Sequence, residues 1–314
     1  MLLRAAQGVK LFDDGRATVD GVPVRGASRI VGCAVGPRNC ALLSEDGTVY
    51  CCIKAVARSL PLGIAACSVA VGSASLTVAL VDGRVLTRAV KTCFTRVPLP
   101  HKAYRVFGGE NTTAAICDTG SLYTWGKNRY QQLGHAAGPG PAAVAVPGTV
   151  ADFGFGKGFG CALTAAGKLY TWGFGEVPLP VALEQRGTFS RIAVGKTYIA
   201  AAYSNRERVL LRGFISGAAC YTVKTVSTPL SALSGGWSST SLYGEFATGA
   251  SMAPAGLPML DLRGRRWLAR RTLLQCIVHE QKKHPVRKRP RRRSEGSCAN
   301  QLPLELWRMV VMYL

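Results

Sequence analysis

The residue types that carry most enzyme chemistry are present but scattered along the chain. The four histidines have no spacing that would place two of them on one metal ion: His101, His135, His279 and His284. The eleven cysteines form no Cys-x-x-Cys pair, so we expect small buried hydrophobic residues rather than metal ligands. The sequence contains no nucleophile elbow and no phosphate-binding loop. It therefore predicts neither an enzyme nor a bound cofactor.

Acidic side chains are sparse and lie next to glycines. Asp46, Asp82 and Asp118 each stand one or two residues before a glycine. Aspartate accepts hydrogen bonds from the backbone of a tight turn, so we interpret these residues as turn formers rather than as an acid–base pair.

About half of the net charge of +22 lies in residues 263–314. Two prolines and dense like charge in residues 282–299 argue against a packed element and favour a basic linker. Such a run is typical of a nuclear-import signal, of contacts to nucleic-acid phosphates, or of a plain solvated linker, and the sequence leaves all three open. The candidate import or nucleic-acid residues are Lys282, Lys283, Arg287, Lys288, Arg289, Arg291, Arg292 and Arg293.

Two short segments flank this linker, and both have helical periodicity. In residues 263–281, Trp267, Leu274 and Ile277 recur at helical spacing, which predicts a helix that packs on the preceding domain or takes part in partner binding. In residues 300–314, Pro303 suits the first turn of a helix, and an apolar stripe follows it. So short a helix is unstable alone in water, so it needs a docking surface on this chain or on a partner.

The elements before these segments form a repeat. The sequence Leu-Tyr-Thr-Trp-Gly occurs twice, at 122–126 and 169–173, and each copy follows a glycine turn. A second glycine stands eleven residues before each turn glycine, and the same frame recurs in diverged copies. The opening glycines are Gly36, Gly72, Gly109, Gly156, Gly195 and Gly236. Such self-similarity indicates repeated supersecondary units.

Each unit reads as an apolar run, an Asp-Gly-like turn and a second apolar run, which predicts a β-hairpin. A repeat of this length with several strands per unit is typical of a β-propeller, whereas a β-sandwich has no reason to repeat the glycine frame. We therefore predict an all-β fold, a seven-bladed or six-bladed propeller with a short helical C-terminal appendage. The N-terminal strands would complete the last blade.

Small residues recur at the fifth position after each opening glycine, where we expect inner strands to crowd towards a shared axis. They are Ala41, Thr77, Ala114, Cys161, Ala200 and Ser241. The uncharged run at residues 64–81 is long enough for a membrane span, but it keeps the register of the repeat, so no membrane contact is expected. No secretory leader is recognisable either.

The segment Leu122–Gly134 resembles the repeat of the regulator-of-chromosome-condensation family, and the copy ending at Gly173 resembles the same motif without its tail. The resemblance covers residues 1–262 and implies a β-propeller. The family's exchange activity on the small GTPase Ran uses a loop wedge, and no inserted segment here matches it. Binding to chromatin, nucleic acid or a small GTPase is the alternative function that this resemblance implies.

Residues 302–314 resemble the opening helix of an F-box, which binds the Skp adaptor of cullin–RING ubiquitin ligases. The positions that match are Leu302, Pro303, Leu306, Val310 and Leu314. A truncated F-box at the C-terminus is similar to the PRANC-type ends of poxvirus host-range proteins.

The two resemblances together suggest a substrate-recruiting subunit of a Skp–cullin–F-box ligase. The propeller would bind an unknown protein target, and the last helix would bind the Skp adaptor and through it cullin-1. A location in the nucleus or cytoplasm, of an infected host cell if the protein is viral, fits this hypothesis. An importin is a further expected partner if the basic segment is an import signal.

Overall fold

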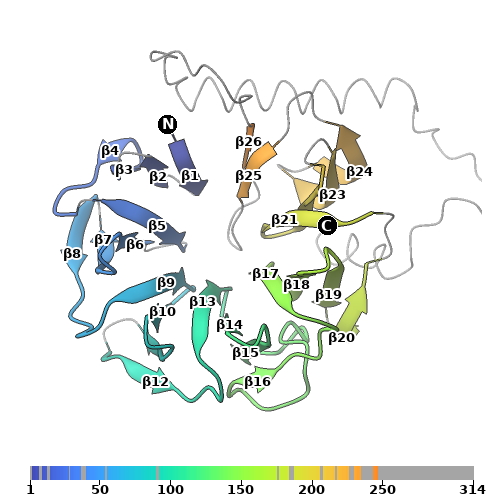
Figure 1. The fold of residues 1–314 in the computed structure, drawn as a ribbon, viewed down its shortest axis with the longest axis horizontal. Helices are drawn as coiled ribbons and strands as arrows, with labels where there is room; N and C mark the ends of the chain where they lie inside the picture. The colour runs from blue at the N-terminus through green and yellow to red at the C-terminus, as the bar shows by residue number, and fades with distance from the viewer. Residues whose placement is uncertain are drawn as a thin grey trace, which may run out of the picture. The chain divides into compact units, whose positions relative to one another are not determined.

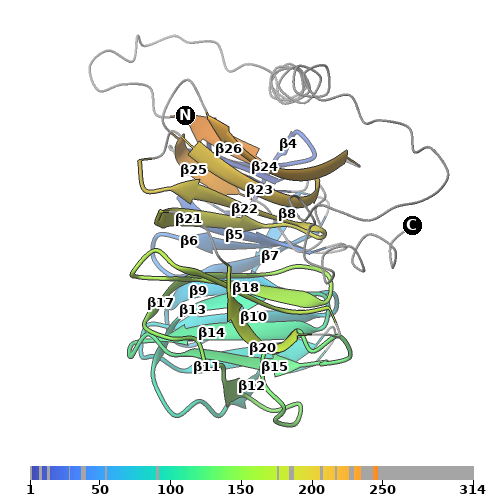
Figure 2. The same cartoon turned by 90° about the vertical axis from the view of Figure 1, so that its right-hand side faces the viewer.

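The computed structural model describes residues 2–6, 9–12, 15–27, 29–36, 40–53, 55–89, 92–174, 177–183, 187–205, 208–215, 218–225, 230–234 and 243–246. All of them lie in the first of two units into which the chain divides, Met1–Thr248. These residues form strands β1 to β26 in antiparallel sheets, with no helix in the described ranges (Figure 1, Figure 2).

The strands group into sheets in chain order, and in the described residues six sheets have four strands and one has two. The first two sheets are β1 (Leu2–Ala6), β2 (Val9–Phe12), β3 (Ala17–Val19), β4 (Val22–Pro23), and β5 (Ile30–Val35), β6 (Cys40–Ser44), β7 (Val49–Ile53), β8 (Val56–Ser59). The next two are β9 (Ala66–Val71), β10 (Ser75–Leu80), β11 (Val85–Ala89), β12 (Thr95–Val97), and β13 (Ala103–Gly108), β14 (Thr112–Cys117), β15 (Leu122–Gly126), β16 (Ala142–Ala143). The last three are β17 (Val150–Phe155), β18 (Phe159–Thr164), β19 (Leu169–Gly173), β20 (Val177–Ala182), then β21 (Phe189–Val194), β22 (Tyr198–Tyr203), β23 (Arg208–Ile215), β24 (Ala218–Thr225), and β25 (Leu230–Ser234), β26 (Tyr243–Phe246).

The first strands of successive sheets contact one another in sequence order, from β5 to β25, and β1 contacts both β5 and β25. The sheets of Met1–Thr248 are thus arranged around a common centre like blades, with the first strand of each innermost (Figure 1). This arrangement confirms the prediction of an all-β propeller.

The glycine turns form the tight hairpins that the repeat predicted. Gly47, Gly83, Gly120 and Gly167 have φ angles of +81°, +89°, +76° and +75°, a region that glycine adopts without steric cost. Asp46 Oδ1 accepts a hydrogen bond from Thr48 N at 2.9 Å, and Asp82 Oδ1 accepts one from Arg84 N at 3.0 Å.

At Gly120 the turn contains Asp118, as predicted, but a different residue makes its side-chain hydrogen bond. Thr119 occupies the position directly before the glycine, and its Oγ1 accepts the hydrogen bond from Ser121 N at 3.3 Å. Thr119 thus holds the position that Asp46 and Asp82 hold in their turns, and Asp118 lies one residue earlier.

The prediction that small residues mark the innermost strands is also wrong. Ala41, Ala114 and Cys161 lie on the second strands β6, β14 and β18, which are buried along their whole length. Each packs into a core cluster with apolar residues of the next sheet; Ala114, for example, clusters with Phe153 and Phe155 of β17. Their small size leaves room for bulky neighbours on the facing sheet.

Thr77 and Ala200 are equally buried on β10 and β22. Ser241 lies outside the described residues.

The N-terminal strands do not complete the last blade. β1 to β4 pair with each other in the order β1-β2-β3-β4, and β25 pairs with β26. Two strands, β1 and β2, precede the turn at Gly15, and two more follow it. The N-terminal segment therefore supplies all four strands of a sheet of its own.

The uncharged run at residues 64–81 forms β9 and β10 of one sheet, in register with the repeat. In the part of the chain that the structure describes, no helix is long and apolar enough to span a membrane. The predicted helix at 263–281, the linker at 282–299 and the F-box-like helix at 300–314 lie outside the described residues.

Candidate functional site

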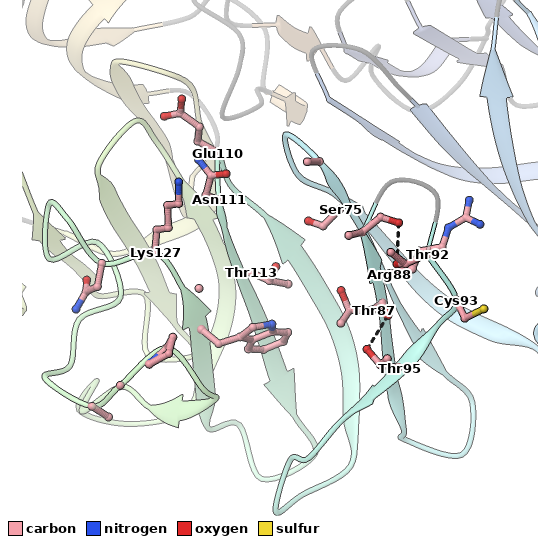
Figure 3. Close-up of a pocket in the computed structure, with 18 residues that line it drawn as sticks. Ser75, Thr87, Arg88, Thr92, Cys93, Thr95, Glu110, Asn111, Thr113 and Lys127 are labelled. Atoms are coloured by element: carbon pink, nitrogen blue, oxygen red, sulfur yellow. Dashed lines mark hydrogen bonds between the residues drawn. The ribbon is translucent and has the colours of Figure 1, made fainter.

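An open groove of about 1040 Å³ lies between sheet β9–β12 and sheet β13–β16. Figure 3 shows Ser75, Thr87 and Thr95 on one side of it and Thr113 on the other. The Trp125 side chain, at the end of β15, also lines the groove and is half-buried.

Hydroxyl groups line the wall of the groove that sheet β9–β12 provides. Thr87 Oγ1 lies 3.0 Å from Thr77 Oγ1 and 3.5 Å from the carbonyl oxygen of Leu76, while Thr95 Oγ1 donates to the carbonyl oxygen of Thr87 at 3.2 Å. This wall can therefore exchange hydrogen bonds with a polar ligand.

Charged side chains stand at the rim of the groove. Arg88 and Lys127 are on opposite sides, and Glu110 is on the Lys127 side (Figure 3). The Arg88 guanidinium lies 5.1 Å from the centroid of the Phe94 ring, which holds it against its own sheet. Two basic groups and one acid give the rim a small positive excess.

The next sheet contains the second copy of the motif, and there the tryptophan is fully covered. Trp172 is 1% exposed, and its Nε1 donates a hydrogen bond to the carbonyl oxygen of Gln132 at 2.8 Å. Gly134 and Gly160 lie so close to the indole that a β-carbon on either would meet it within 3 Å. Trp172 thus binds a stretch of main chain from the preceding repeat.

That stretch belongs to the loop at residues 127–135, which is fixed by its own hydrogen bonds. Thr124 Oγ1 donates to the carbonyl oxygen of Leu133 at 2.6 Å, and Asn128 Oδ1 accepts from Leu133 N at 3.0 Å. His135 Nε2 lies 3.1 Å from the carbonyl oxygen of Thr124. The loop is therefore held by Thr124 on its own sheet and by Trp172 on the next.

The groove is open because the repeat before Trp125 has no such loop. Residues 90–94 alone link β11 to β12, whereas residues 127–141 link β15 to β16. In addition, Thr113 pairs with Trp125 in the way that Gly160 pairs with Trp172. Because Thr113 has a β-carbon, the Trp125 indole cannot lie against its strand as closely as Trp172 does.

The eight cysteines whose side chains are described are all free thiols. Cys33, Cys40, Cys52, Cys117 and Cys161 are buried, as predicted, whereas Cys51 is partly buried and Cys67 and Cys93 are exposed. Burial, and secondarily the Asp118 carboxylate, raises the pKa of the Cys117 thiol to about 11. Among the described residues, no group of three His, Cys, Asp or Glu side chains could hold a metal ion.

The site residues that the sequence predicted all lie outside the described residues, so these predictions stand as predictions. They are Leu302, Pro303, Leu306, Val310 and Leu314 for the Skp adaptor, and the basic residues between Lys282 and Arg293 for import or nucleic acid. The groove beside Trp125 was missed by sequence reasoning. The signal available in the sequence was the short segment after Ala89. It lacks a counterpart of the loop at residues 127–135, so the motif that contains Trp125 has no such loop in the repeat before it.

Residues 119–159 and 105–132 match two models of the regulator of chromosome condensation (RCC1) repeat. The chain carries RCC1 repeats. The human E3 ubiquitin-protein ligase HERC2 is 28% identical over 155 residues, which is 48% of this chain. The mouse HERC2 matches to the same extent, and the chain spans only 3% of the length of these relatives.

Solved structures, among them that of yeast RCC1, have a similar fold. The Saccharomyces cerevisiae protein Prp20p, whose binding to Gsp1p and histones has been characterised, aligns with a TM-score of 0.61 and 15% identity over 76% of this chain and 80% of its own. Yeast RCC1 (Prp20) bound to Kap60 gives 0.63 with 15% identity over 76% and 78%. Human WBSCR16 gives 0.59 with 15% identity over 73% and 78%. The RCC1-like propeller predicted from sequence is confirmed.

Proposed function

We propose that the chain recruits a protein partner through its RCC1-like propeller and delivers it to a Skp–cullin–F-box ubiquitin ligase. The observation that carries the recruiting role is the groove beside Trp125, an open site in a scaffold whose other described tryptophan is covered by main chain. Recruitment needs no catalytic group, because an adaptor acts by raising the local concentration of its target near the ligase.

The ligase part of the proposal rests on residues 302–314. Their apolar stripe places Leu302, Leu306 and Val310 on one face of a helix that needs a docking surface. The relative HERC2 is named as an E3 ubiquitin-protein ligase, which supports a link between this kind of repeat and ubiquitin transfer. We further propose that the complete propeller has seven blades.

Affinity capture tests the ligase part. The full-length protein and a protein ending at Asn300 are used as bait, and the Skp adaptor and cullin-1 are detected by immunoblotting. We expect both to be recovered only with the full-length protein. A full-length variant, Leu306→Ala with Val310→Ala, removes the apolar stripe without shortening the chain. It is expected to lose both partners as the truncated protein does. Equal recovery with all baits, or none with the full-length protein, would rule out this adaptor role.

A second candidate function is binding to chromatin or to a small GTPase. The basic segment around Arg291 and the binding of Prp20p to Gsp1p and histones favour it. Neutralising Lys282, Lys283, Arg287 and Lys288 separates the two candidates. Loss of salt-sensitive DNA binding together with retained Skp capture would assign this segment to nucleic acid, whereas loss of nuclear accumulation alone would assign it to import.

A further inference from the structure

The groove contains counterparts of both groups that hold the covering loop in the next repeat. Thr87 corresponds to Thr124, because both pair with the fifth residue after an opening glycine, Thr77 and Ala114 respectively. Trp125 corresponds to Trp172 in the repeated motif. Thr124 and Trp172 bind the carbonyl oxygens of two consecutive residues of the loop, whereas no covering loop lies over Thr87 and Trp125 in the described structure.

Both counterparts can donate a hydrogen bond to a ligand. In the described residues, the Trp125 indole N–H has no hydrogen-bond partner, and the indole lines the groove. Thr77 can donate to Thr87 Oγ1 at 3.0 Å, which leaves the Thr87 hydroxyl hydrogen only a long contact of 3.5 Å to Leu76. A peptide carbonyl would give each donor a shorter bond.

We propose that the groove binds an acidic peptide of a partner protein, in a turn conformation like that of the covering loop, that contains an apolar residue followed by glycine. The carbonyl before the apolar residue accepts from Trp125 Nε1, and the carbonyl of the apolar residue accepts from Thr87. The glycine lies against the indole, as Gly134 lies against Trp172. This inference rests on the proposed recruiting role and specifies the class of target.

The charged side chains at the rim of the groove favour acidic residues on both sides of the apolar–glycine pair. Arg88 and Lys127 stand on opposite sides of the groove and outnumber Glu110. Acidic residues on either side of the apolar–glycine pair would pair with these two cations, and a basic peptide would be repelled by them. The loop at 127–135 is itself basic, so it does not suit this groove as it stands.

The probe is a fluorescein-labelled peptide that copies residues 128–135 with glutamate in place of Arg129 and His135. Binding to the full-length protein is measured by fluorescence anisotropy. We expect saturable binding, and loss of binding when the glycine of the peptide is replaced by valine, because a side chain there would meet the indole.

Two variants of the protein test the contacts. Trp125→Phe keeps a ring but removes the N–H, so we expect an affinity about 3- to 10-fold lower. Lys127→Glu changes only an exposed charge and is expected to weaken binding about threefold, with a smaller salt dependence. Tyr104→Ala, an exposed residue outside the groove, serves as the control and is expected to change nothing.

The proposal is overturned if the acidic peptide does not bind, or if the valine peptide and both groove variants bind as tightly as their parents. Skp capture does not involve the groove, so it should be unchanged in Trp125→Phe. A failure of peptide binding with retained Skp capture would reject the groove as the target site and leave the binding of the Skp adaptor standing. Peptide binding without Skp capture would support the groove and reject the link to the ligase.

Discussion

The two copies of Leu-Tyr-Thr-Trp-Gly have the same residues and pair in the same register, yet their tryptophans differ in environment. Trp172 is buried, makes a hydrogen bond of 2.8 Å to main chain and lies between two glycines. Trp125 is half-buried and lines an open groove. The difference arises from residues outside the motif, namely the length of the preceding link and the threonine at position 113. A repeat motif therefore builds either a core contact or a binding site, depending on the repeat before it.

The largest effect that this comparison predicts is on stability. Trp172→Ala is expected to lower the free energy of unfolding by about 3–5 kcal/mol, because it empties a fully packed position and leaves the Gln132 carbonyl without its donor. Trp125→Ala is expected to cost less, about 1–2 kcal/mol, because its indole is only partly buried at the edge of a core cluster and, among the described residues, covers no main-chain donor or acceptor. Urea denaturation followed by circular dichroism measures both, and equal losses would show that the two tryptophans are equivalent.

A smaller effect is expected at the glycine that packs on Trp172. Gly134→Ala should lower the free energy of unfolding by about 1–3 kcal/mol, since Gly134 has φ of +73° and no room for a β-carbon. Gly138 has open space at its β-carbon position, so Gly138→Ala is the matched control, with a change of about 0.5 kcal/mol or less. The comparison between the repeats would lose its basis if the two variants unfolded at the same urea concentration.

The reactivity of two cysteine thiols compares the groove with the core in the unmutated protein. Cys93 lines the groove and is exposed, whereas Cys117 is buried and its pKa is raised to about 11, so it is a neutral thiol near pH 8. Iodoacetamide should label Cys93 within minutes and leave Cys117 unlabelled in the native protein. Peptide mass mapping gives the extent at each position, and labelling in urea is the control. Rapid native labelling of Cys117 would contradict the packing described here.

The smallest effect is expected in a hairpin turn remote from both tryptophans. Hydrogen bonds from Ser44 and Thr48 lower the pKa of Asp46 below its ordinary value of 3.8. The ionised carboxylate therefore stabilises the fold above that value, and the stabilisation is lost as the pH falls through the folded-state pKa. The gap in unfolding midpoint between the parent and Asp46→Ala should narrow between about pH 6 and about pH 2. A gap that widens on acidification would reverse the assigned sign.

Sequence reasoning succeeded where a local pattern has a local cause. The positive φ of Gly47 and its counterparts follows from the hairpin turn, and the repeated frame of glycines was enough to predict successive antiparallel sheets. It failed where the cause lies in pairing between distant segments. Leu2–Ala6 was not recognised as a strand, so the N-terminal sheet was assigned to the last blade. The small residues on β14 and β18 were assigned to the wrong strand of each blade.

The sequence by itself determined the type of fold, because period, turn glycines and apolar runs are properties of neighbouring residues. The same sequence also contains both tryptophan motifs, and nothing in their five residues distinguishes them. Only the tertiary structure decided which tryptophan is covered, because the covering loop comes from a different repeat and reaches Trp172 through a contact forty residues away in the chain. The groove beside Trp125 exists for the same reason: the preceding link is too short to supply main chain there, so Thr87 and the indole are left facing solvent-accessible space.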